Sequence, residues 1–114
     1  MNSRAYSIID FWFNKTPSEK RFKKDVSFDE EIRKNFIEDY NLAKLNHYDD
    51  WLNQSRECLA LIILLDQFSR NLFRDKKEAF DQDQKARLAV NQGIYLGYLE
   101  EFNETERLFF LLPL

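Results

Sequence analysis

Apolar residues recur every three or four positions along most of the chain, which is the spacing of one face of an α-helix. Residues 4–13 follow this spacing, and the polar stretch before Pro17 predicts that the first helix stops near Asn14. A second stripe covers residues 28–46. No glycine or proline lies between Pro17 and Gly93, so the sequence favours long helices over tight hairpin turns.

The run 58–65 is apolar at every position, which is typical of a central helix covered on all sides. Ser55 is predicted to cap this helix at its start. The β-branched pair Ile62 and Ile63 would also suit a strand, but the length of the segment and its leucine and alanine content favour a helix.

Three four-residue motifs have the form of a capping box, in which the first and fourth side chains each accept a hydrogen bond from the other residue's backbone N–H. They are SFDE at 27–30, DQDQ at 81–84 and NETE at 103–106, and each predicts a helix start. Trp51 is expected to anchor the polar connection before the central helix onto the core. The sequence therefore predicts an all-α domain of about five helices.

Composition and charge narrow the function classes. A chain of 114 residues, 44% apolar and 16% aromatic, is long enough to fold as one domain with a real core. The net charge of -3 argues against a nucleic-acid binder, which needs a clustered excess of basic residues. One local basic cluster could contact an anionic partner, although such clusters are usually solvated loops or helix faces. It consists of Lys15, Lys20, Arg21, Lys23 and Lys24.

The single cysteine, Cys58, excludes an internal disulfide, and its place in the apolar run predicts an inert buried thiol. No secretory signal is recognisable, and the longest apolar run is far shorter than the ~20 residues that span a bilayer. We therefore expect a cytoplasmic protein without a membrane partner. Phosphate-binding loops, dinucleotide fingerprints and Ser/His/Asp sets are missing from the sequence, so no cofactor is predicted.

Polar residues follow the central apolar run without a break. On a continuous helix Asp66 and Arg70 are i,i+4 partners, and Arg74 lies one step further along the same face. Gln67 and Asn71 form a second polar row beside them. This carboxylate with two guanidinium groups, at the edge of a buried helix, is the candidate ligand-binding site.

Three interpretations of this cluster stay open. It could be a structural network, since buried charges persist only when they are paired. It could be a recognition site in which Arg70 and Arg74 hold a carboxylate or phosphate while Asp66 orients them. It could also belong to a hydrolytic enzyme that uses Asp66 with Asp25 or Asp29 as a carboxylate pair. Whether the chain is an enzyme is therefore left open.

Two further motifs have simpler explanations. His47 precedes Asp49 and Asp50, but a metal site there would lack a second nitrogen or sulfur ligand, so a surface loop is expected and no metal is predicted. The G-x-x-x-G motif at 93–97 is expected to allow close helix packing or to end a helix, because the stretch is too short and amphipathic for membrane dimerisation.

Five stretches span nearly the whole chain in order: IIDFWF, RFKKDVSFDEEIRKNF, DDWL, LALIILLDQFSRNLFRDKKEAF and ERLFFLLPL. In these stretches the chain resembles the bacterial domain of unknown function 924 family. The resemblance implies a tetratricopeptide-like bundle of antiparallel helix hairpins, a soluble bacterial protein and no established activity. On the matching motifs it points to a set of site residues, with the last three as companions: Asp66, Gln67, Arg70, Asn71, Arg74, Asp25, Asp29 and Arg107.

The last seven residues, 108–114, carry no charge and would need a cover if they were exposed. Family members look to continue past this stretch with a His-Ser-Glu segment and further helices. We therefore expect residues 1–114 to form one helical domain that is the N-terminal part of a longer one, with self-association through this end as an alternative cover. The leading hypothesis for function is a binding or interaction module whose Asp/Arg groove takes an unknown small anion or a protein partner.

Overall fold

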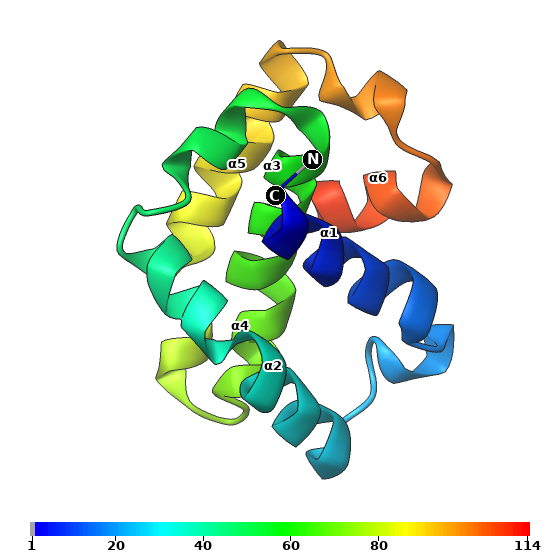
Figure 1. Ribbon diagram of the computed structural model, residues 1–114, viewed down its shortest axis with the longest axis vertical. Coiled ribbons are helices and arrows are strands. Elements are labelled where there is room, and N and C mark those ends of the chain that lie inside the picture. Colours follow the sequence, from blue (N-terminus) through cyan, green and yellow to red (C-terminus); the bar gives the residue numbers. More distant parts are fainter. Residues whose placement is uncertain (1) are drawn as a thin grey trace.

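The computed structural model describes residues 2–114, and no β-strand occurs in this part of the chain. Five continuous helical runs form its long elements, and two of them contain a π-helical segment (Figure 1). The runs are α1 at Ser3–Ile9 with a π-helical extension at Asp10–Lys15, α2 at Val26–Lys44, α3 at Ser55–Ile62 joined through a π-helical segment at Ile63–Phe68 to α4 at Ser69–Leu72, α5 at Asp83–Tyr95, and α6 at Glu104–Leu111. The predicted all-α class and the number of helices are confirmed.

The helix α3 runs through the middle of the molecule, with α1, α5 and α6 packed around it (Figure 1). Every side chain from Cys58 to Leu65 is 0% exposed. Full burial of one leucine or isoleucine stabilises a fold by about 1.5–3 kcal/mol, so this run supplies a large share of the driving force. The central helix is confirmed, and Trp51, also buried, anchors the connection before it as predicted.

Aromatic rings fix the end of the central helix from its inner side. The ring centroid of Phe68 lies 5.7 Å from that of Trp12 and 5.0 Å from that of Phe36. Trp12 in turn packs edge-on against Phe109 of α6 at 5.4 Å. The polar cluster after Leu65 is therefore built on a backbone that rings from α2, α6 and the first helix hold in place.

One of the three capping boxes is confirmed and another is wrong. At the start of α6, the Asn103 side chain accepts the Glu106 N–H at 2.9 Å, and the Glu106 carboxylate accepts the Asn103 N–H at 3.0 Å. At α2, however, the cap is Asp25, whose carboxylate accepts the Phe28 N–H at 3.0 Å. An aspartate two positions earlier takes the capping role, so Ser27 lies inside the helix and its hydroxyl donates to Asp25.

The remaining two capping predictions are also wrong. The helix α5 begins at Asp83, and the residue before it, Gln82, makes no capping hydrogen bond through its side chain. The Asp83 carboxylate is instead paired with an arginine of α4. Ser55 is the first residue of α3 rather than its cap, because its hydroxyl donates to Glu101 at 2.9 Å.

The two glycines of the G-x-x-x-G motif serve packing and helix termination, as predicted. A Cβ atom at Gly93 would lie 2.4 Å from Cζ of Phe110, so α6 packs directly onto the glycine backbone. Gly97 has φ of 80°, in the left-handed region, just after the end of α5. Within residues 2–114, no helix has the length and apolar character that crossing a membrane requires.

The apolar C-terminal stretch is docked on one side only. Phe109 and Phe110 of α6 are buried, whereas Leu108 and Leu114 remain 51% and 62% exposed. The fold itself therefore covers the two phenylalanines of this stretch and leaves the two leucines in contact with solvent. Self-association through the exposed leucines stays a prediction.

Candidate functional site

The polar cluster lies where the central helix widens into a π-helical turn. Asp66 and Gln67 belong to the π-helical segment, Arg70 and Asn71 belong to α4, and Arg74 follows its end. Wide turns of this kind are rare inside helices and are frequent at functional sites. The backbone geometry therefore indicates a functional site here independently of the polar side chains.

Asp66 is a buried acid with two polar partners. Its side chain accepts a hydrogen bond from Gln67 Nε2 at 2.8 Å and lies 3.4 Å from Arg70 Nη1. Burial raises the pKa of Asp66 above its ordinary value, while the bond from Gln67 and the charge of Arg70 oppose that rise. Perturbed acids of this kind cluster at functional sites and also occur in structural ion pairs.

Arg70 ties α4 to the start of α5. Its two terminal nitrogens donate to the two carboxylate oxygens of Asp83, at 2.8 and 3.3 Å. Nη1 also donates to the backbone carbonyl of Asp66 at 2.8 Å, and the guanidinium carbon lies 4.9 Å from the ring centroid of Phe80. Asp83 is the first residue of α5, where a negative charge also suits the helix dipole. The orientation of this guanidinium is therefore fixed from three directions.

Arg74 makes the equivalent connection to α2. Its Nε and Nη2 donate to the two carboxylate oxygens of Asp29, at 2.6 and 2.9 Å, and Asn71 Nδ2 donates to the same carboxylate at 2.9 Å. The hydrogen bond to Asp29 raises the pKa of Arg74. Asp29 lies in the first turn of α2, so both arginines bridge from the central helix to the first turn of a neighbouring helix.

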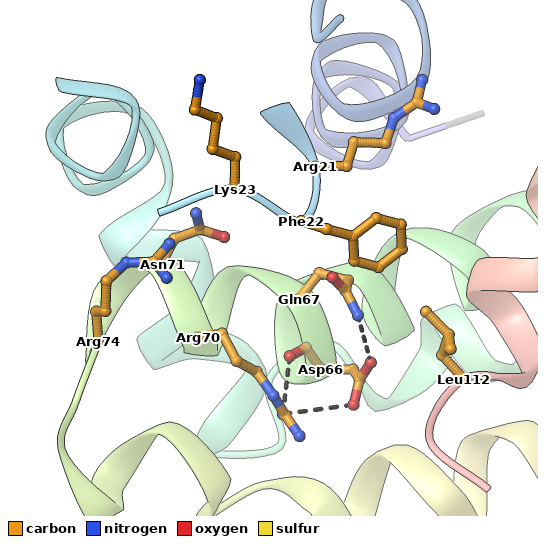
Figure 2. A pocket seen from close by; sticks show the side chains of 9 residues that line it. All are labelled: Arg21, Phe22, Lys23, Asp66, Gln67, Arg70, Asn71, Arg74 and Leu112. Carbon is orange, nitrogen blue, oxygen red and sulfur yellow. Dashed lines mark hydrogen bonds and ion pairs between the residues drawn. The ribbon is translucent and has the colours of Figure 1, made fainter. Parts of the chain in front are cut away.

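These side chains form one wall of an open groove of about 350 Å³ (Figure 2). The other wall comes from the loop before α2, where the Phe22 ring lies above Gln67 and Lys23 stands at the rim. Arg21 of the same loop turns away and donates to the backbone carbonyl of Trp12 at 3.1 Å. The groove is lined by Arg21, Phe22, Lys23, Asp66, Gln67, Arg70, Asn71, Arg74 and Leu112.

The fold brings most of the predicted site residues to this groove. Its lining includes Asp66, Gln67, Arg70, Asn71 and Arg74. Asp29 stands behind Arg74 as its partner, as the family resemblance implied for a companion residue. Asp25 caps α2 outside the lining, and the exposed Arg107 donates to the carbonyl of Leu99 at 2.8 Å, also outside it.

Several groove residues lay outside the predicted site. Arg21 and Lys23 belong to the basic cluster that the sequence assigned to a solvated loop, so their charge was visible but the position of the loop was not. Asp83, which holds Arg70 from behind the groove, was seen only as an inner residue of the predicted DQDQ capping box. Within residues 2–114 no group of three His, Cys, Asp or Glu side chains is arranged to hold a metal, and His47 is exposed in the turn after α2.

Comparison with known proteins identifies the family of the chain. A sequence model described as a bacterial protein of unknown function, DUF924, matches residues 8–114. The chain belongs to the DUF924 family. A solved structure of a protein of unknown function from Agrobacterium tumefaciens resembles this DUF924 chain over 96% of its residues, with 36% sequence identity and a TM-score of 0.92. This chain spans 62% of the length of that protein. No curated protein matches it significantly.

Membership of DUF924 confirms the family that the motifs suggested. The family and the solved relative are both described as of unknown function, so neither supplies a substrate or a partner. Any function for this DUF924 chain has to be argued from the chemistry of the groove.

Proposed function

We propose that this DUF924 domain is a binding module whose groove holds an anionic group, a carboxylate or a phosphate. The observation that supports the proposal is that the protein's own carboxylates balance only part of the positive charge that lines the groove. Arg70 and Arg74 have carboxylate partners, but Lys23 at the rim of the groove has no ion pair within residues 2–114. A bound anion would therefore meet positive charge that the protein leaves unbalanced.

The two arginines support the proposal because their orientation is fixed before any ligand arrives. Asp83 and Asp29 each hold one guanidinium through two nitrogens. The remaining terminal nitrogen of Arg74, Nη1, makes no hydrogen bond within the described residues and is free to donate to a ligand. Binding to a side chain that is already ordered costs less entropy than binding to a mobile one.

Asp66 would orient Arg70 rather than contact the anion. Its carboxylate accepts the amide of Gln67, which is the lining residue between it and the opposite wall (Figure 2). This contact reduces the repulsion that a bare carboxylate would exert on an anion in the groove.

Thermal unfolding in phosphate or in glutarate, at constant ionic strength, tests the proposal. At ten times the Kd a ligand stabilises the folded state by about 1.4 kcal/mol, which raises the midpoint by about 6 °C for a chain of this size. Lys23→Gln should weaken binding about two- to fivefold without loss of stability, because Lys23 is exposed and unpaired within residues 2–114. Arg74→Lys should weaken it about tenfold, since a lysine keeps the charge but cannot hold Asp29 through two nitrogens and present a third to the ligand.

The matched control is Lys34→Gln, an exposed lysine in a different hollow beside Arg4. Phosphate and glutarate also stabilise proteins generally, by exclusion from their surfaces, and that effect is the same in all variants. Equal ligand-induced increases in wild type, Lys23→Gln and Arg74→Lys would therefore show that the proposed function is wrong.

The hydrolase alternative stays a prediction, and the contacts do not favour it. Both oxygens of Asp29 are taken by Arg74 and Asn71, and Asp25 is committed to capping α2. Neither carboxylate is free to act as the second acid beside Asp66.

A further inference from the structure

A second open hollow adjoins the groove and shares Arg70 and Arg74 with it. Its volume is about 540 Å³, and it extends over the loop after α4, where Lys76, Lys77 and Phe80 line it. The two arginines therefore form a ridge that lines both hollows, and the hollows lie side by side on one elongated surface. We call the two hollows together the basic face.

The basic face carries an excess of positive charge on a chain whose net charge is -3. Its lining contains six basic side chains and two acidic ones, although the guanidinium of one of the six, Arg21, turns away from the groove. Lys76 and Lys77, like Lys23, have no ion pair within residues 2–114, and the acidic Asp75 is neutralised by Lys24 at 2.8 Å. Even when the carboxylates behind Arg70 and Arg74 are counted, the face keeps an excess of positive charge.

Large apolar side chains stand exposed in both hollows. Phe22 in the first is 71% exposed, Phe80 in the second is 58% exposed, and Leu112 at the end of the first is 39% exposed. Aromatic and arginine side chains are enriched among the residues that contribute most of the binding free energy of protein interfaces.

We infer that the ligand of this surface is an acidic polypeptide segment whose carboxylates bind along the Arg70–Arg74 ridge while its apolar side chains cover Phe22 and Phe80. This inference rests on the proposed function and names its partner class. Arg70 is held by Asp83 of α5 and Arg74 by Asp29 of α2, so the ridge presents two ordered guanidinium groups to successive carboxylates of one bound segment.

The shape and charge of the surface favour a polypeptide over the other occupants. Small-molecule sites enclose most of their ligand, whereas both hollows here are open and lie on the two sides of the same pair of arginines. A single-stranded nucleic acid would be attracted by the same local charge, but the chain as a whole is acidic, which opposes the binding of a long polyanion.

Fluorescence anisotropy with labelled peptides and the whole chain tests the inference. The probe is an amphipathic peptide of about 15 residues with glutamates at i,i+4 and leucine and phenylalanine beside them. One reference peptide has every glutamate replaced by glutamine, and another has the apolar residues replaced by serine. We expect the acidic apolar peptide to bind at least tenfold more tightly than either reference peptide.

Variants of the chain test whether the peptide binds at the two hollows. Phe80→Ser and Phe22→Ser should each weaken binding about tenfold, and Lys77→Gln about two- to fivefold. Tyr95→Ser is the matched control, since Tyr95 is 89% exposed and lies outside both hollows, and it should change the affinity less than twofold. The Phe22 ring stacks on Phe109 at 5.5 Å, so a change there could loosen the loop; Phe80→Ser and the serine peptide test the apolar contribution without that loop.

Three results would overturn the inference. The glutamine peptide could bind as tightly as the acidic one, Phe80→Ser could bind as wild type does, or an oligothymidylate could bind more tightly than the acidic peptide. Glutarate binding that depends on Lys23, with no preference for the acidic peptide, would overturn the inference and leave the proposed function standing. Loss of the glutarate effect itself would instead count against the proposed function.

Discussion

Replacing Asp29 by asparagine would remove the charge that holds Arg74 while keeping the shape of the side chain. The two side chains are 13% and 25% exposed and meet through two hydrogen bonds of 2.6 and 2.9 Å. Hydrogen bonds to charged groups contribute about 1.5–3 kcal/mol when well buried, and partial exposure lowers this figure. We therefore expect a coupling free energy of about 1–2 kcal/mol between Asp29 and Arg74.

A double-mutant cycle in urea measures this coupling from wild type, Asp29→Asn, Arg74→Gln and the double variant. Each single variant should lower the free energy of unfolding by about 1–2 kcal/mol, and the double variant by much less than their sum. The ion pair of Lys24 with Asp75 is the control, because it has a similar distance of 2.8 Å but both side chains are largely exposed, and it should show no measurable coupling. A coupling between Asp29 and Arg74 as small as that of the control would refute the argument that the site is pre-ordered.

Three further predictions concern the fold around the site. Gly93→Ala should cost about 1–3 kcal/mol of unfolding free energy, because its Cβ would lie 2.4 Å from Cζ of Phe110, and the cost should shrink in a Phe110→Leu background; an unchanged cost would contradict this packing. Burial raises the pKa of Cys58 to about 12, so a thiol reagent near pH 8 should label it only as fast as the protein opens, and rapid labelling of the native protein would be the contrary result. The raised pKa of Asp66 means that the folded state binds this proton more tightly than the unfolded chain, so wild type should lose stability relative to Asp66→Asn as the pH rises from about 3.8 through the raised pKa; urea titrations at several pH values check the sign of that slope.

The helices were predictable because their patterns are local. Apolar spacing located the central helix, and the uniformly apolar run 58–65 predicted its complete burial. Helix starts were less predictable, since Ser27 and Asp25 are both suitable caps and only the fold decides which lies at the end of the helix. The π-helical turn at Ile63–Phe68 left no sequence signal, because its residues would suit an α-helix equally well.

The candidate site was likewise predictable from the sequence only in part. Asp66 and Arg70 are four residues apart on helical backbone, so their proximity follows from helical geometry, whereas Arg74 lies past the end of α4 and not on the continuous helix that was predicted. Their partners do not follow from it, because Asp83 lies on α5 and the loop with Phe22 and Lys23 crosses the groove from before α2. Those contacts depend on how the helices pack, which a local pattern does not specify.

The central claim is that the groove between the loop before α2 and the wall of α4 binds an anionic group. The most direct test is a titration of the isotope-labelled chain with glutarate, followed by NMR through the backbone amides and the arginine Nε–H groups. The account predicts saturable shift changes confined to Phe22, Lys23 and residues 66–74, which Lys23→Gln reduces. Shift changes scattered over the surface, or identical in wild type and Lys23→Gln, would contradict it.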